Sequence, residues 1–184
     1  MLKKVVLSFM LFIITAFMPV FAAKDNPNKS IVIYYSLNGN TQMMAEKIQS
    51  FTGSDLYKIE TAKPYSDNYK KFSEKILHEV TYKKCPKLKQ KKLNDLYQYD
   101  TVFLGIPVYY GDIAPAMRTF LKANKLKGKT VVPFFSLDNG ALGNAWKTAK
   151  KLSGKTHFKD GFEYRIKDNS SIDAEILDWL YSIK

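Results

Sequence analysis

The fold is decided by the stretch Ile31-Val32-Ile33-Tyr34-Tyr35-Ser36-Leu37-Asn38-Gly39-Asn40-Thr41. Its first five residues are apolar or aromatic without a break, which is typical of a strand buried on both faces of a parallel sheet. A short polar loop with one glycine follows. Apolar residues then recur at helical spacing from Met43 to Phe51. The stretch therefore predicts a buried strand, a tight loop and a helix.

The same alternation continues along the chain. Further strands are expected at residues 55–59, 101–104, 130–135 and 162–166, and a helix is expected after each of them. Asp67 is expected to cap the second helix, and Ser170 or Ser171 the last one. In the second helix, Tyr69, Phe72, Ile76 and Val80 share one face, which is expected to be buried. Strands that alternate with helices predict an α/β protein with an open, doubly wound parallel sheet of five strands and helices on both faces. We expect one such domain over residues 31–184, preceded by a linker at 23–30.

The first 22 residues differ from the rest of the chain. Lys3 and Lys4 precede an apolar run that ends in Val20-Phe21-Ala22, a pattern typical of a secretory signal peptide. Pro19 and the small residues at the end of the run favour cleavage after Ala22 or Ala23, and an uncleaved membrane anchor is the alternative. The protein is therefore expected to be exported, either periplasmic or secreted, or held at a membrane by its N-terminus.

The charge of the chain is strongly positive, +12 at pH 7, and falls to +10 without residues 1–22. The excess is almost entirely lysine, because Arg118 and Arg165 are the two arginines. Bidentate contacts to phosphates and bases favour arginine, so we expect no nucleic-acid partner. An acidic protein, an anionic membrane surface or plain solvation of a lysine-rich surface would each suit this charge. Six of the lysines lie in residues 83–92, which read as an exposed connection around Cys85.

Three loops are expected at the carboxyl ends of the strands, where ligands bind in such sheets: 36–41, 105–112 and 136–144. The first opens directly into a helix, whose unpaired amides and positive dipole end favour a phosphate. It lacks the lysine of a nucleoside-triphosphate loop and the GxGxxG spacing of a dinucleotide site. From the loop alone, a capped helix without a ligand remains an equal alternative.

Two segments give the chain a resemblance to a known family. Ser36-Leu37-Asn38-Gly39-Asn40-Thr41 resembles the Ser-x-Thr-Gly-Asn-Thr phosphate loop of the flavodoxin family, with Asn38 at the third position. The stretch from Tyr99 to Gly111 resembles that family's Tyr-Asp-x-Val-Phe-Leu-Gly-x-Pro-x-Trp-Trp-Gly segment, with Tyr109 and Tyr110 in place of the tryptophans. The resemblance covers about residues 31–183 and implies the strand order 2-1-3-4-5.

The resemblance also implies a cofactor, flavin mononucleotide (FMN), and an oxidoreductase or electron-transfer protein that acts on a redox partner protein or a small acceptor such as a quinone. Together with the N-terminal pattern, this predicts a flavoprotein that acts outside the cytoplasm. In the family, residues at these positions bind the cofactor: Ser36, Asn38, Gly39, Asn40, Thr41, Pro107, Val108, Tyr109, Tyr110, Gly111, Ser136, Asp138, Asn139 and Gly140. The cofactor carries the chemistry, so no catalytic acid or base is expected. Asp138 stands where the family has small residues, which keeps open a flavodoxin-like binding module that has lost its flavin.

The remaining reactive residues form no pattern. His78 and His157, the two histidines, lie far apart in the sequence without acids or cysteine at ligand spacing, so no metal site is expected. Cys85 is a single cysteine among lysines, which favour its thiolate, and is more simply explained as an exposed residue.

Overall fold

The computed structural model describes residues 29–138, 140–165 and 172–183. Its sheet contains β1 (Ser30–Tyr34), β2 (Asp55–Lys58), β3 (Thr101–Tyr109), β5 (Thr130–Leu137), β6 (His157–Phe158) and β7 (Phe162–Arg165). These strands are parallel, in the order β2-β1-β3-β5-β6, with β7 also paired to β5. The predicted order 2-1-3-4-5 is confirmed, and the fifth position is occupied by two short segments, β6 and β7, rather than by one strand. Strand β4 (Asp112–Ile113) pairs antiparallel with the end of β3.

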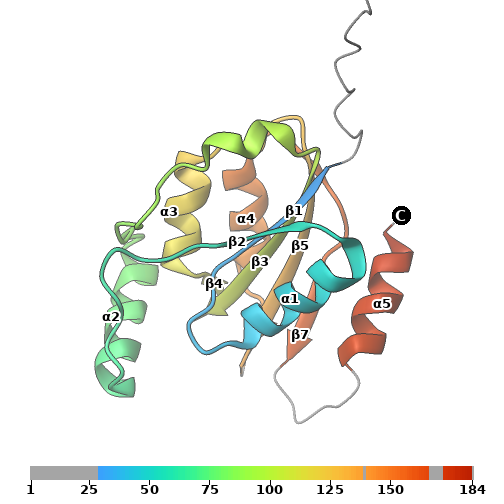
Figure 1. Ribbon diagram of the computed structural model, residues 1–184. Helices are drawn as coiled ribbons and strands as arrows, with labels where there is room; N and C mark the ends of the chain where they lie inside the picture. The colour runs from blue at the N-terminus through green and yellow to red at the C-terminus, as the bar shows by residue number, and fades with distance from the viewer. Residues whose placement is uncertain (1–28, 139, 166–171, 184) are drawn as a thin grey trace, which may run out of the picture.

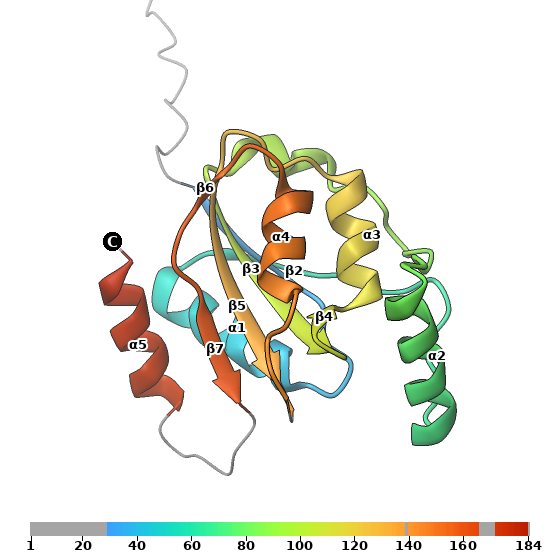
Figure 2. The ribbon, with the colours of Figure 1, turned by 180° about the vertical axis from the view of Figure 1, so that it is seen from behind.

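Helices cover both faces of the sheet, as Figures 1 and 2 show from opposite sides. Helices α1 (Asn40–Thr52) and α5 (Ile172–Ser182) pack on one face around Val32, Phe134 and Trp179. Helices α3 (Pro115–Ala123) and α4 (Ala145–Ser153) pack on the other, and α2 (Tyr69–Thr81) lies at the edge opposite α5. A single 3-10 turn, η1 (Asn94–Gln98), precedes β3.

Strand β3 is longer than the sequence predicted, because it continues past Gly105 to Tyr109. Strand β1 pairs with β3 only as far as Tyr34 opposite Gly105, while β5 pairs with it up to Pro107 opposite Ser136. The backbone groups of Pro107 face the side on which β1 has already ended, so its missing N–H removes no bond from the sheet. Its carbonyl instead accepts from the amide of Ala114 at 3.0 Å.

Helix α2 begins one residue later than predicted. Asn68, not Asp67, is its N-cap, and the Asn68 side chain accepts from the Lys71 amide at 3.1 Å. Tyr69 was expected on the buried face with Phe72 and Ile76, but its side chain is 80% exposed. It occupies the first helical position, beyond the edge of the core. The predicted caps of α5, Ser170 and Ser171, lie outside the described residues.

Candidate functional site

The loop between β1 and α1 presents backbone donors. Gly39 caps the helix with a φ of 86°, a left-handed conformation that glycine adopts without strain, and its amide donates to the Ser36 hydroxyl at 3.1 Å. The first helical bond runs from the Met43 amide to the Gly39 carbonyl at 2.8 Å. The amides of residues 40–42 precede that bond, as the first amides of a helix do, and lie at its positive end. The loop is therefore a cradle for an anion.

A hydroxyl pair joins this loop to the next element. Thr41 and Ser136 are both buried, and their hydroxyl oxygens are 2.7 Å apart although the residues are 95 positions apart in the chain. Each hydroxyl can donate once and accept twice. Ser136 can therefore donate to Thr41 and leave the Thr41 proton for a ligand.

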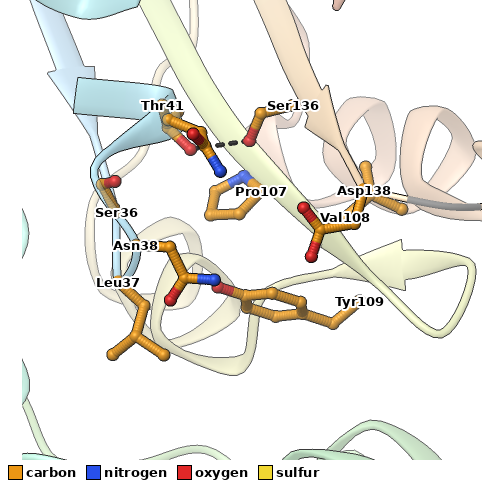
Figure 3. A pocket seen from close by; sticks show the side chains of 10 residues that line it. Ser36, Leu37, Asn38, Thr41, Pro107, Val108, Tyr109, Ser136 and Asp138 are labelled. Atoms are coloured by element: carbon orange, nitrogen blue, oxygen red, sulfur yellow. Dashed lines mark hydrogen bonds between the residues drawn. The ribbon is translucent and has the colours of Figure 1, made fainter. Parts of the chain in front are cut away.

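These elements border an open hollow (Figure 3). It is lined by Ser36, Leu37, Asn38, Asn40, Thr41, Pro107, Val108, Tyr109, Ser136 and Asp138. None of these ten residues is a lysine or an arginine, so an anion there would be held by amides and neutral side chains.

The second predicted loop is a tight hairpin rather than an open loop. Tyr109 pairs with Asp112 across β3 and β4, so Tyr110 and Gly111 form a two-residue turn. Both have positive φ, 50° and 71°, which defines a type I′ turn. A tyrosine in this conformation is strained by about 1–2 kcal/mol. Its hydroxyl is hydrogen-bonded to Ser73 of α2, which fixes the ring against that helix.

The hairpin is fastened to its surroundings. The Asp112 carboxylate accepts from the Arg118 guanidinium at 2.6 Å, and both side chains are largely buried. On the other side, the Gly111 carbonyl accepts from the Asn144 amide at 2.6 Å. A Cβ on Gly143 would lie 2.4 Å from the same carbonyl, so the hairpin and the third loop pack backbone against backbone.

The third loop follows β5, which extends to Leu137. Asp138 is exposed and lines the hollow, and the Gly140 carbonyl accepts a hydrogen bond from the Arg165 guanidinium. Asn139 lies outside the described residues. The two arginines of the chain thus each hold one of the loops that flank the hollow.

A second, wider hollow adjoins the first, and the two share Asn38, Val108, Tyr109 and Asp138. It is lined in addition by Tyr69, Phe72, Ser73, Ile76, Tyr110, Gly111, Leu137, Gly140 and Ala141. Helix α2 therefore forms one wall of the site, which the sequence analysis did not predict. The sequence indicated only the helix itself, because Tyr69 and Phe72 fit the pattern of a face buried in the core as well as that of a ligand-binding wall.

Tyr109 stands between the two hollows. Its ring packs edge-to-face on Phe72, with ring centroids 6.0 Å apart. Burial raises the pKa of the Tyr109 hydroxyl well above its usual range, and Tyr35 and the Asp138 carboxylate raise it further. The hydroxyl is therefore neutral at physiological pH and available as a hydrogen-bond donor.

A buried carboxylate lies behind this wall. Glu79 of α2 is 5% exposed, accepts from the Tyr65 hydroxyl at 2.6 Å and pairs with Lys75 at 2.9 Å. Burial, then the hydrogen bond to Glu79, raises the pKa of Tyr65. This pair anchors α2 to the segment that leads into it.

The structure brings the predicted residues together. Twelve of the fourteen line one or both hollows, and Gly39 lies in the cradle backbone. Of the other candidates, Cys85 and His78 are exposed. Within residues 29–138, 140–165 and 172–183, no group of three or more histidines, cysteines or acids could hold a metal ion. In the same ranges, no helix is long and apolar enough to cross a bilayer.

The fold and the cradle define a class: a doubly wound α/β domain with a candidate anion site where β1 and β3 lead to helices on opposite faces of the sheet. Such sheets bind ligands at this point. Within that class, the family model described as flavodoxin matches residues 29–183. The chain belongs to the flavodoxin family. The resemblance seen in the sequence is thereby confirmed.

Solved structures agree with this assignment. A Bacteroides eggerthii DSM 20697 protein assigned as a flavoprotein is 32% identical, with a TM-score of 0.71 over 84% of this chain and 97% of that one. A flavoprotein from Lactobacillus acidophilus NCFM, solved in complex with FMN, is 25% identical, with a TM-score of 0.60 over 80% of this chain and 97% of that one. No curated protein matches the sequence.

Proposed function

We propose that this protein binds FMN and transfers electrons outside the cytoplasm. The observation that carries the proposal is the anion cradle, in which the start of α1 and the Thr41 side chain border a hollow whose lining has no basic side chain. A family member solved with FMN supports the same cofactor.

The residues present fit the two ends of FMN. Neutral donors at a helix start suit the phosphate, since a dianion there interacts with both the amides and the helix dipole. The wider hollow, walled by Tyr109, Tyr110 and Phe72, suits a planar aromatic ring. Asn38 lines both hollows and can donate to a ligand at their junction.

FMN, when bound, supplies the electron transfer, and the chain supplies binding, orientation and electrostatics. Tyr109 and Tyr110 exclude water from the ring end, and Tyr109 keeps a neutral hydroxyl there. Asp138 places a carboxylate beside the same space, which opposes added negative charge on a ligand. These residues favour a low reduction potential.

The electron acceptor is a redox partner protein or a small molecule such as a quinone, and the site of action is the periplasm or the cell exterior. The basis for the location is the N-terminal pattern of residues 1–22, with a cleaved signal peptide or a retained anchor as its two outcomes. Mass spectrometry of the native protein from the cell envelope separates these outcomes, because cleavage after Ala22 or Ala23 removes the lysine-flanked apolar run. Full-length protein in the cytosolic fraction would contradict export.

The proposal is tested by comparing FMN with riboflavin. Both carry the same ring, so only the phosphate distinguishes them. We expect the fluorescence of FMN to be quenched on binding at micromolar concentration. Riboflavin should bind at least about 100-fold more weakly, which is the loss of affinity expected when two charge-assisted hydrogen bonds are removed. Equal affinities would contradict the cradle, and absence of binding by both would contradict the flavin.

A second candidate is favoured by one observation, the exposed Asp138 carboxylate in the hollow. It is a flavodoxin-like module without flavin that recognises another ligand. Replacement of Asp138 by glycine separates the two. If the native protein binds no FMN and Asp138→Gly restores binding, the second candidate is correct.

A further inference from the structure

The positive charge of the chain is concentrated in one part of it. Residues 61–93 contain ten lysines and three acidic residues, a net charge of +7 out of +12. Residues 23–60 are neutral, and residues 94–184 carry +3. This segment comprises α2 and the connections on both sides of it, and α2 is a wall of the wider hollow.

The lysines of this segment all point to solvent. They are Lys63, Lys70, Lys71, Lys75, Lys83, Lys84, Lys87, Lys89, Lys91 and Lys92. Two of them have an acidic partner within the described ranges, Lys75 with Glu79 and Lys89 with Glu60. A mainly uncompensated positive field therefore surrounds α2.

The lysine loop, residues 83–92, is held in a fixed conformation. On one side, Lys87 and Leu88 pair with the segment after β2, and the Ala62 amide donates to the Lys87 carbonyl at 2.8 Å. On the other, Thr119 of α3 donates to the Pro86 carbonyl and Asn124 to the Lys91 carbonyl, both at 2.8 Å. A charged connection that only interacts with water would not need these hydrogen bonds on both sides. The lysines are presented as a defined array.

Exposed aromatic and apolar side chains lie within this field. Tyr69 is 80% exposed, Tyr110 53%, Leu77 46% and Tyr82 65%. Tyr69, Ser73 and Leu77 recur at four-residue spacing and therefore share one face of α2. Tyr110 is hydrogen-bonded to Ser73 and joins that face to the rim of the wider hollow. Interfaces between proteins have this composition, with tyrosines at the centre and charges at the rim.

We infer that the exposed face of α2, together with the lysine loop, is the docking surface for an acidic redox protein. The inference rests on the proposed function, because electron exchange at this surface requires a flavin in the wider hollow. A partner bound to Tyr69 and Tyr110 would cover the mouth of that hollow. The lysines would steer the partner and the tyrosines would form the centre of the contact. A membrane surface suits the lysines but not this pattern, because Leu77 is the only aliphatic side chain among the four exposed ones.

The test uses an acidic plant-type [2Fe–2S] ferredoxin as a probe and the FMN-loaded mature protein. The variant Lys83→Gln/Lys84→Gln/Lys87→Gln/Lys91→Gln removes four charges from the lysine loop. Its matched control, Lys147→Gln/Lys150→Gln/Lys151→Gln/Lys155→Gln, removes four exposed charges from α4 and the turn after it, on the far side of α3. At low ionic strength we expect the rate constant for reduction by the ferredoxin to fall about tenfold or more in the loop variant and less than about threefold in the control.

A second pair of variants examines the contact itself. Leu77→Ser should weaken ferredoxin binding severalfold at every salt concentration. Tyr181→Ser, which removes a larger and more exposed side chain from α5 (67% exposed against 46%), should not. Equal losses in the two lysine variants would mean steering by net charge alone and would overturn the inference, as would failure of the native protein to bind the probe. Loss of binding to phosphatidylglycerol vesicles in the loop variant, with unchanged reduction by ferredoxin, would identify a membrane surface instead and would also overturn it.

The outcome is separable from that of the proposed function. Ferredoxin binding is measured by calorimetry on the flavin-free protein, and FMN binding by fluorescence in the absence of ferredoxin. Normal FMN binding without ferredoxin binding contradicts the docking surface alone, and the reverse contradicts the flavin alone.

Discussion

Replacing Thr41 by valine tests the cradle, because valine keeps the shape of the side chain and removes only the hydroxyl. In the native protein the hydroxyl lies 2.7 Å from that of Ser136, in a position to accept from it and donate to a phosphate. Two effects follow from its loss. The ligand loses one hydrogen bond to a charged group, and Ser136 loses its partner in a buried place.

The two effects appear in different measurements. A hydrogen bond to a charged group contributes about 1.5–3 kcal/mol, so the dissociation constant for FMN should rise about 10- to 150-fold. The orphaned Ser136 hydroxyl exists with and without ligand, so it largely cancels in binding. It should lower the free energy of unfolding of the flavin-free protein by about 1–3 kcal/mol.

Ser136→Ala is the matched control. It leaves the Thr41 hydroxyl free to donate to the ligand, so FMN affinity should change by less than about threefold. The stability of the flavin-free protein should fall by about 1–3 kcal/mol, as for Thr41→Val, because one buried hydroxyl again loses its partner. In the double variant the stability losses should be less than additive, since both remove the same bond. FMN titration by fluorescence and urea unfolding give all the values. A native FMN affinity in Thr41→Val would show that the Thr41 hydroxyl does not contact the phosphate. An equal loss of affinity in Ser136→Ala would contradict the separate roles of the two hydroxyls.

Three further outcomes are expected. Gly143→Ala should destabilise the protein by about 1–3 kcal/mol more than Gly128→Ala in urea unfolding. Both glycines have positive φ, but of the two only Gly143 would place a Cβ against a backbone, that of Gly111. Equal losses of stability would contradict the packing of the two loops. Gly105→Ala should lower stability by at least about 1–3 kcal/mol, since its Cβ would lie 2.5 Å from an aromatic ring of β5, and a native-like urea midpoint would show that the sheet can adjust. Stability should fall as pH rises above about 10, because the raised pKa values of the three buried tyrosines near the site keep them neutral in the folded protein while the unfolded chain ionises. Tyr109→Phe should make that slope smaller, and an unchanged slope would contradict the burial of its hydroxyl.

The sequence predicted the central strands β1, β3 and β5 because they are nearly continuous apolar runs, a property that follows from burial on both faces of the sheet. It did not predict the end of β3, because Pro107 normally argues against a central strand. Only the early end of β1, opposite Gly105, makes the proline acceptable there. Strand ends are set by neighbours distant in the chain, which no local pattern contains.

The site was predictable to a similar degree. Ser36–Thr41 was recognisable because a phosphate cradle is local: one turn of backbone and its own side chains. The wall formed by α2 was not, because Tyr69 and Phe72 fit the pattern of a buried face equally well. Whether a helical aromatic faces the core or a ligand depends on where the helix ends relative to the sheet.

The fastening of the loops has a consequence for ligand binding. The hairpin is held by Arg118, the third loop by Arg165, and the two meet at Gly111 and Gly143. A site whose walls are already fixed loses little conformational entropy when a ligand enters, so more of the contact energy appears as affinity. The strained Tyr110 turn fits the same account, because its conformation is maintained by these contacts without any ligand. Arg118→Met should then weaken FMN binding although Arg118 lines neither hollow, and the loss should appear in the association rate, since the loops must be ordered first.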